Sequence, residues 1–223
     1  CARMDPTDPN QLASLASLFQ QTLNPEQRKP AEDQIGQLQA QPRFGFLLLA
    51  LVQSESTSTA IRLASAIQFK NLCKTRWNVD AETEDPVFSA ISDDEKQAIR
   101  QQLVPVLVSL ASASTPSQAI LSQMNESVAL VASSDFPEAW PALIDELVSQ
   151  LSTDNHHVLL SVLATSHAIF KQWRSQFRSD ALYSEINLVL GKMANPLLEL
   201  LQRMHGMLPV SYTHLTLPTI YSV

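Results

Sequence analysis

The stretch Ser134-Asp-Phe-Pro-Glu-Ala-Trp-Pro141 decides the fold, because it places two prolines and two large aromatic residues between two long helical patterns. Proline fixes its own φ angle and disfavours the α conformation in the residue before it. A helix that ends near Ser133 must therefore break before another begins at Pro137. Phe136 and Trp140 are large enough to fill the space at such a corner. The stretch predicts two consecutive helical hairpins joined by a packed corner.

Apolar residues recur at helical spacing on both sides of this corner, and breaks divide the pattern into pairs of helices. Asn24-Pro25 and a Ser/Thr-rich turn near residue 56 separate the helices of two early pairs. A third pair opens with a capping box between Ser92 and Glu95. A helix pair every ~40 to 50 residues without strand signals is typical of HEAT repeats. We therefore expect an all-α fold, an elongated and curved α-solenoid of HEAT-type helical hairpins with four repeats and one helix of a fifth.

The same pattern predicts where the segments of the chain begin and end. Met4 resembles a natural start, and residues 202–223 abandon the helical period for a mixture of Thr, Leu, Pro and Tyr. We expect five segments: a disordered N-terminus at 1–9 with non-native residues before Met4, repeats one and two at 10–78, an acidic loop at 79–91, repeats three, four and the start of five at 92–201, and a non-native tail at 202–223.

Composition excludes several kinds of protein. Only four glycines occur, and phosphate-binding loops need glycine wherever the backbone approaches a phosphate. The two cysteines, Cys1 and Cys73, cannot form a disulfide framework or a metal quartet, which favours a reducing compartment. The most hydrophobic window, residues 44–52, is about half the length needed to span a bilayer. We therefore expect an intracellular protein without membrane insertion.

No set of residues has the pattern of a catalytic or metal site. His156 and His157 are adjacent at a helix start and cannot both face one metal ion. His167 lies near apolar neighbours and is expected to pack against them, and Cys73 lies in a helix with no evident base beside it. The sequence predicts a protein that is not an enzyme and has no cofactor and no metal site.

Negative charge is concentrated in the middle of the chain. Between Asp80 and Phe170 there are thirteen acidic and two basic residues, a net charge of −11 within a total of −7. Such a segment repels nucleic acid and anionic membranes, so we expect no nucleic-acid partner. It attracts a basic protein surface or a basic peptide. The alternative, that these acids only keep the face solvated, stays open.

Four strings of residues carry a family resemblance. PAEDQIGQLQAQPRFGFLLLALVQ at 30–53 and IRLASAIQFKNLCKTRW at 61–77 resemble the N-terminal domain of the importin-β (karyopherin) family. SSDFPEAWPALIDELVSQL at 133–151 and SHAIFKQWRSQFRSDALYSEINLVL at 166–190 resemble export receptors of the same family. Together the resemblance spans nearly all of residues 10–201, and it identifies 10–78 with the importin-β N-terminal domain.

This resemblance implies a fragment of a longer nuclear transport receptor that shuttles between nucleus and cytoplasm through the nuclear pore of the nuclear envelope. Its implied partners are Ran-GTP, importin-α as cargo, and nucleoporins. In this family the inward-facing second helices of the first repeats contact Ran, and here they correspond to residues 25–40, 59–77 and 116–133. The polar residues that match the family pattern, and are thereby the implied Ran-binding residues, are Gln68, Lys70, Asn71, Lys74, Gln123 and Glu126.

Two alternatives remain at this point. The Lys70-Asn71 step could instead bond to the next turn or loop, and Arg62 could be a structural partner between helices. The whole arm could also be a HEAT-repeat scaffold for protein–protein assembly outside transport, because all such arms share the same apolar stripe and period.

Overall fold

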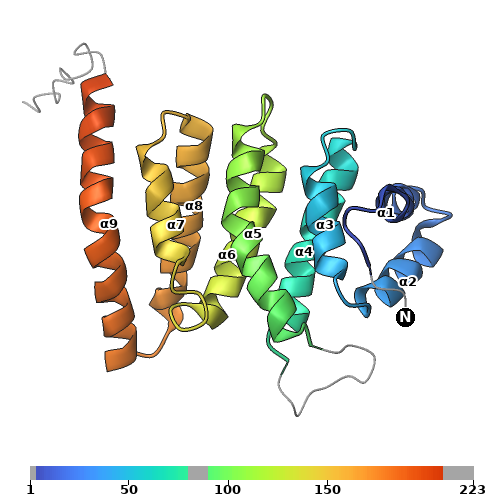
Figure 1. Cartoon of the computed structure of the whole chain (residues 1–223), viewed down its shortest axis with the longest axis horizontal. Coiled ribbons are helices and arrows are strands. Elements are labelled where there is room, and N and C mark those ends of the chain that lie inside the picture. Colours follow the sequence, from blue (N-terminus) through green and yellow to red (C-terminus); the bar gives the residue numbers. More distant parts are fainter. Residues whose placement is uncertain (1–3, 80–89, 208–223) are drawn as a thin grey trace, which may run out of the picture.

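The computed structural model describes residues 4–79 and 90–207, and within these ranges every regular element is a helix. Figure 1 shows the helices side by side along the longest axis. In chain order they are α1 (Pro9–Thr22), α2 (Arg28–Gln39), α3 (Phe44–Gln53), α4 (Thr59–Arg76), α5 (Asp93–Ser112), α6 (Gln118–Asp135), α7 (Leu143–Ser149), α8 (His156–Gln172) and α9 (Asp180–Met207), with short 3-10 turns η1 (Gln150–Ser152) and η2 (Trp173–Ser175).

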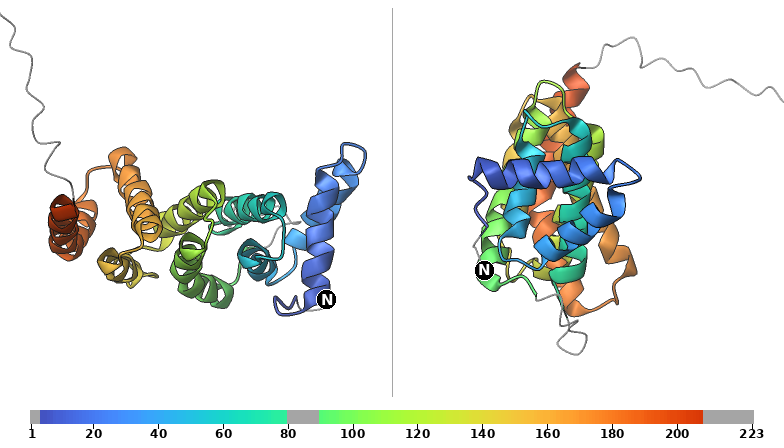
Figure 2. Two further views of the ribbon diagram at one scale, coloured as in Figure 1. Left: turned by 90° about the horizontal axis from the view of Figure 1, so that it is seen from above. Right: turned by 90° about the vertical axis from the view of Figure 1, so that its right-hand side faces the viewer.

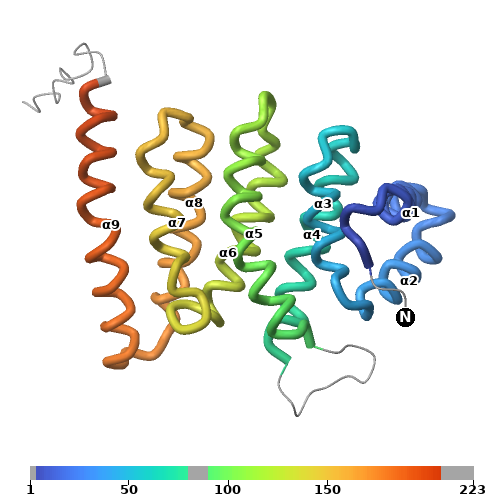
Figure 3. The backbone as a smooth tube through the Cα atoms, in the orientation of Figure 1, coloured from blue at the N-terminus to red at the C-terminus, as the bar shows by residue number. Residues whose placement is uncertain are grey.

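Successive helices form antiparallel hairpins that stack in two rows. The chain reverses between α3 and α4, between α5 and α6, and between α7 and α8, as the tube in Figure 3 shows. One row consists of α4, α6 and α8, and the other of α3, α5 and α7 (Figure 2). Helices of the first row pack along one another far more extensively than those of the second. That row therefore forms the inner side of the curve, and we call it the inner row. The expected α-solenoid is confirmed.

The first hairpin departs from this regular stack. Figure 2 shows α1 lying across the direction of the other helices. It packs on α2, α3 and α4 through Leu15, Leu18 and Phe19, which are buried. Helix α2 does not pack along α4 in the way that α4 packs along α6. Residues 59–77 and 116–133 contain α4 and α6 of the inner row, whereas α2, within residues 25–40, is not packed along that row.

Helix α5 begins with the Ser92 cap that the sequence predicts, but Glu95 does not play its expected part in that cap. The Ser92 hydroxyl accepts a hydrogen bond from the Glu95 backbone N–H at 3.4 Å, as a capping box requires. The Glu95 carboxylate does not complete the box, because it accepts from the backbone N–H of Arg43 at 3.0 Å. Arg43 has a left-handed conformation, with φ of 67°, at the start of α3. The glutamate therefore ties α5 to the loop before α3.

At the corner, residues 134–141, the backbone differs from the sequence prediction, whereas the burial of the aromatic side chains agrees with it. Helix α6 ends at Asp135 and α7 begins only at Leu143, so no helix starts at Pro137. The Asp135 carbonyl accepts the backbone N–H groups of both Ala139 and Trp140, at 2.7 and 2.9 Å, which folds residues 136–142 into turns. Phe136 and Trp140 are buried, with 4% of Trp140 exposed. The aromatic side chains fill the corner as predicted.

Both ends of the described chain are more ordered than the sequence indicates. Met4 is 7% exposed, and the Asp8 carboxylate accepts the Asn10 backbone N–H at the start of α1, so disorder over 1–9 does not hold for residues 4–9. Helix α9 continues to Met207, six residues beyond its expected end at Leu201. Arg203 lies in this added stretch, and its guanidinium donates to the carbonyls of Leu151, Ser152 and Thr153 at 2.8, 3.0 and 3.1 Å. Residues 1–3, 208–223 and most of the expected acidic loop (80–89) lie outside the described residues.

Trp140→Ala should reduce the free energy of unfolding by about 3 to 5 kcal/mol, because removal of a buried indole leaves a large cavity between hairpins. Urea denaturation followed by circular dichroism measures this change. Phe177→Ala is the matched control, since Phe177 is 89% exposed and its truncation should cost less than about 0.5 kcal/mol. A cost below about 1 kcal/mol for Trp140→Ala would contradict the role of the corner.

Arg203→Ala should loosen the last turns of α9, because three carbonyls at the end of η1 lose their shared donor. Amide hydrogen exchange should become about tenfold faster in residues 197–206 and stay unchanged in α4 and α6. Gln202→Ala, an exposed neighbour, serves as the control. Equal exchange rates in both variants would show that Arg203 does not hold the helix.

Candidate protein-binding surface

The six residues singled out in the sequence lie on two neighbouring helices of the inner row. Helix α4 buries Phe69, Leu72 and Cys73 in the core, and this leaves Asn71 and Lys74 exposed on the other side of the helix. Gln68 and Lys70 lie at the edge of the exposed stripe and are partly buried. On α6 the matching positions are Gln123, which is partly buried, and Glu126, which is exposed.

The structure brings Lys70 and Glu126 together. The Lys70 ammonium lies 3.4 Å from Glu126 Oε2, and the two side chains are 20% and 56% exposed. Ion pairs this exposed stabilise a fold by about 0 to 1 kcal/mol, so the pair contributes little to stability. Its main consequence is electrostatic: the charge of Lys70 is partly neutralised, and Lys74 is left as the more accessible cation on this part of α4.

The contacts of Lys70 and Arg62 bear on two structural alternatives. Lys70 bonds across the boundary between repeats rather than to the next turn of its own helix. Arg62 is a structural residue, because its Nε donates to the Val52 carbonyl at 2.8 Å and so satisfies the end of α3. Gln123 Oε1 is buried without a hydrogen-bond partner among the described residues. The side chain as a whole is partly buried, so only part of it is available at the surface.

The acidic middle of the chain does not line the inner row. Helices α4 and α8 contain no acidic residue, and α6 contains only Glu126 and the buried Asp135. The described acids of the middle segment instead lie on α5, the corner, α7 and the turn before α8, as Asp93, Asp94, Glu95, Glu138, Asp145, Glu146 and Asp154. The inner row carries Arg62, Lys70, Lys74, Arg76 and Lys171 and is therefore weakly basic.

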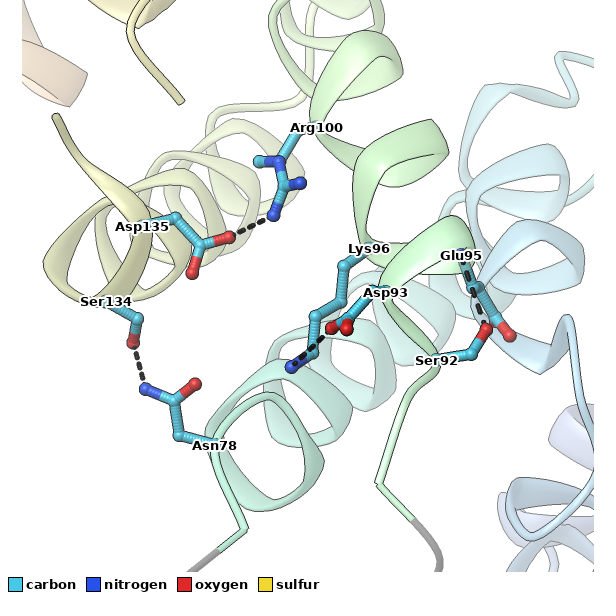
Figure 4. Close-up of polar contacts among 8 residues, drawn as sticks. All are labelled: Asn78, Ser92, Asp93, Glu95, Lys96, Arg100, Ser134 and Asp135. Atoms are coloured by element: carbon cyan, nitrogen blue, oxygen red, sulfur yellow. Dashed lines mark hydrogen bonds and ion pairs between the residues drawn. The ribbon is translucent and has the colours of Figure 1, made fainter. Parts of the chain in front are cut away.

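A group of polar contacts holds α4, α5 and α6 in register at one end of the inner row (Figure 4). Arg100 and Asp135 form an ion pair in which both side chains are largely buried. Asn78 Nδ2 donates to the Ser134 hydroxyl at 2.6 Å, and the Lys96 ammonium lies 5.9 Å from the ring centroid of Trp77. These contacts fix the spacing of α4 and α6, so the surface between them is preorganised.

These structural partners have no local signal in the sequence. Arg100 and Asp135 are 35 positions apart, and Lys70 and Glu126 are 56 apart. Arg76 is also buried; it donates to the Gln39 carbonyl, and burial lowers its pKa while the Glu95 carboxylate acts in the opposite direction. The one local signal is the position of Arg76 in the last turn of α4, because basic side chains near the C-terminus of a helix can donate hydrogen bonds to carbonyl groups.

The described residues offer little basis for a metal site, a reactive cysteine or a membrane-spanning helix. Over residues 4–79 and 90–207, no three His, Cys, Asp or Glu side chains are grouped so that they could hold a metal ion. Burial raises the pKa of the Cys73 thiol, which keeps it protonated and unreactive. No helix within these ranges is long and apolar enough to cross a membrane.

Comparison with known proteins gives a consistent result. The family model of the importin-beta N-terminal domain matches residues 31–109, and the family model Cse1 matches residues 169–215. The second match includes part of the segment expected to be a non-native tail. Exportin-2 of Drosophila melanogaster is 35% identical over 201 residues, which are 89% of this chain and 20% of that protein. The importin alpha re-exporter of Saccharomyces cerevisiae is 36% identical over 191 residues, 86% of this chain and 19% of that protein.

A solved structure gives the same result for the fold. The exportin Cse1 in its cargo-free, cytoplasmic state matches with a TM-score of 0.74 and 34% sequence identity, over 86% of this chain and 20% of that one. The chain thus spans about a fifth of the length of these relatives. The chain is a homologue of the exportin-2 (Cse1) proteins and corresponds to a fragment of their N-terminal region.

Proposed function

We propose that this chain is the N-terminal arm of a nuclear export receptor that binds Ran-GTP and helps to carry importin-α from the nucleus to the cytoplasm. The observation that supports the proposal most is the similarity to exportin-2 and to an importin alpha re-exporter, which covers 89% and 86% of this chain and is therefore not confined to one hairpin. In the cell, such a receptor shuttles through the pores of the nuclear envelope and contacts nucleoporins during passage.

The inner row between α4 and α6 is the proposed Ran-binding surface. Asn71 and Lys74 are exposed there, and the Lys70–Glu126 pair lies beside them with Gln68 and Gln123 at its edges. The weakly basic character of this row fits an acidic or polar face of a folded partner. The exposed ion pair is also weak enough to open, so both of its charged groups can exchange partners on binding.

A HEAT-repeat scaffold outside transport is the competing function, and nucleotide dependence separates the two. A transport receptor should bind Ran loaded with GTP at least tenfold more tightly than Ran loaded with GDP, whereas a scaffold should not distinguish them. Isothermal titration of the full-length receptor with each loaded form, with and without importin-α, measures the difference. Equal affinities in all four titrations would overturn the proposal.

Replacing both Lys70 and Lys74 by Glu should weaken Ran-GTP binding by about 1 to 3 kcal/mol, and less at high salt, because charges on a recognition surface act mainly through complementarity. The control replaces Lys29 and Arg178 by Glu, two exposed bases outside the inner row, and makes the same change in net charge. Circular dichroism should be unchanged in both variants. Equal affinity losses in both would show a general charge effect and no localised site.

A charge swap separates binding from stability at the Lys70–Glu126 pair. Lys70→Glu places two carboxylates together and should lower stability slightly, and the double variant Lys70→Glu with Glu126→Lys should restore it. We expect Ran-GTP affinity to stay reduced in the swapped protein, since the charges then face the partner in reversed positions. Full recovery of affinity would assign the pair a purely structural role.

A further inference from the structure

The connection between α8 and α9, residues 171–179, combines an exposed aromatic side chain with several cations. In Figure 1 the chain passes from α8 to α9 at the lower edge of the stack. Phe177 is 89% exposed, more than any other large apolar side chain that the structure describes. Lys171, Arg174 and Arg178 are exposed as well. A lone exposed apolar residue is common on protein surfaces, but an aromatic ring accompanied by arginines is a composition typical of protein interfaces.

The three cations have no partner within the described residues, 4–79 and 90–207. Most lysines and arginines of these ranges form an ion pair, a side-chain hydrogen bond or a contact with an aromatic ring. The exceptions among the described residues are Lys29, Lys74, Lys171, Arg174 and Arg178. Three of these five lie in one stretch of eight residues, 171–178, so unpaired positive charge is concentrated there.

Helix dipoles account for Lys171 but not for Arg178. Lys171 lies in the last turn of α8, where the negative end of the helix dipole favours a cation. Arg178 directly precedes Ser179, whose hydroxyl accepts the Leu182 backbone N–H at 3.2 Å at the start of α9. The start of a helix favours anions, so an unpaired cation in this position does not stabilise α9. The contacts of the fold therefore give Arg178 no structural role.

Contacts on the inner side of the connection hold it in place. The Trp173 ring stacks on Phe170 with centroids 4.8 Å apart, and Trp173 Nε1 donates to Glu185 Oε1 at 2.8 Å. The Ser175 hydroxyl donates to the Gln172 carbonyl at 2.9 Å. These contacts attach η2 to both α8 and α9. A partner therefore meets side chains on a backbone that is already ordered, which lowers the entropic cost of binding.

Neighbouring acids limit the kind of anion that can bind. Gln176 and Ser179 line a pocket together with Glu138 and Glu185, so carboxylates lie beside the cations. The chain as a whole has a net charge of −7. Nucleic acid or an anionic membrane brings negative charge over a wide area, which these acids repel. A short segment with two or three carboxylates can reach the cations without approaching the acids.

We propose that residues 171–178 bind a short acidic segment of a partner protein that carries apolar side chains between its carboxylates. Arg174 and Arg178 donate to the carboxylates, for which a guanidinium is suited because it can form two parallel hydrogen bonds. Lys171 adds positive charge at one edge, and an apolar side chain of the segment packs on Phe177. The site lies beyond the end of the inner row and does not depend on the Ran-binding surface of α4 and α6.

The test uses the full chain and a defined probe. The probe is a fluorescein-labelled octapeptide of alternating leucine and aspartate, compared with one peptide in which lysine replaces aspartate and another in which serine replaces leucine. Fluorescence anisotropy should show saturable binding of the leucine–aspartate peptide and at least tenfold weaker binding of the other two. Equal binding of the serine–aspartate peptide would reduce the site to general charge attraction and overturn the proposal.

Two variants locate the binding on this connection. Arg178→Gln should weaken the leucine–aspartate peptide about fivefold, because a charge-assisted contact is lost. Lys29→Gln is its matched control, since it removes the same charge from another exposed cation without a partner. Phe177→Ala should weaken the peptide about tenfold, and Leu201→Ala, which truncates a 66% exposed apolar residue near the other end of α9, should change it less than about twofold. Equal losses in a variant and its control would show that the peptide binds elsewhere.

Polyanions and Ran provide the remaining comparisons. A twenty-nucleotide oligothymidylate and phosphatidylserine vesicles should each bind at least tenfold more weakly than the leucine–aspartate peptide. Tighter binding of either one that is lost in Phe177→Ala would show that the proposed occupant is wrong. In the full-length receptor, Arg178→Gln should leave the affinity for Ran-GTP within about twofold, because the two surfaces are separate. A tenfold loss there would assign Arg178 to the Ran-binding surface and overturn an independent site.

Discussion

Asp135 holds the stack together at the point where one hairpin passes to the next. Its carboxylate pairs with Arg100 of α5 while its carbonyl accepts two backbone N–H groups from the following turn. The first contact fixes α6 against α5, and the second stops α6 and turns the chain so that Trp140 enters the core. A buried ion pair of this kind is costly to break from one side, because the remaining charge stays desolvated. Asp135 therefore connects α5, α6 and the turn that leads to α7.

Local signals in the sequence were sufficient for the helices and for most of their ends. The apolar stripe predicted the hairpins because it depends on spacing within a single helix. The corner was harder: two prolines predicted the break, but the start of α7 at Leu143 depends on hydrogen bonds to Asp135 that no spacing rule contains. Glu95 failed as a capping-box partner for a similar reason, since a distant N–H on Arg43 competes for its carboxylate.

The surface was less predictable than the fold, because a surface is made by helices that are far apart in the sequence. The family pattern selected residues on α4 and α6, and the structure shows these helices side by side with Lys70 and Glu126 in contact. The sequence could not indicate which row would receive the acidic residues. Counting charges along the chain placed them in the middle, whereas in space they are separated by row: α4, α6 and α8 are weakly basic, and most acids belong to α5, α7 and the corner. Two chemically different surfaces thus arise from one stretch of chain.

The crossing of α1 over the first hairpins has a consequence for assembly. A stack of repeats has an apolar edge at each open end, and an edge that matches the opposite end of another copy can grow into a fibre. Helix α1 covers the edges of α3 and α4 with Leu15, Leu18 and Phe19, and it turns Ser14, Ser17 and Gln20 outward. Helix α9, in contrast, exposes Leu190, Leu198 and Leu201. The outward side of α1 is therefore polar and offers another copy of the chain little apolar surface on which to pack.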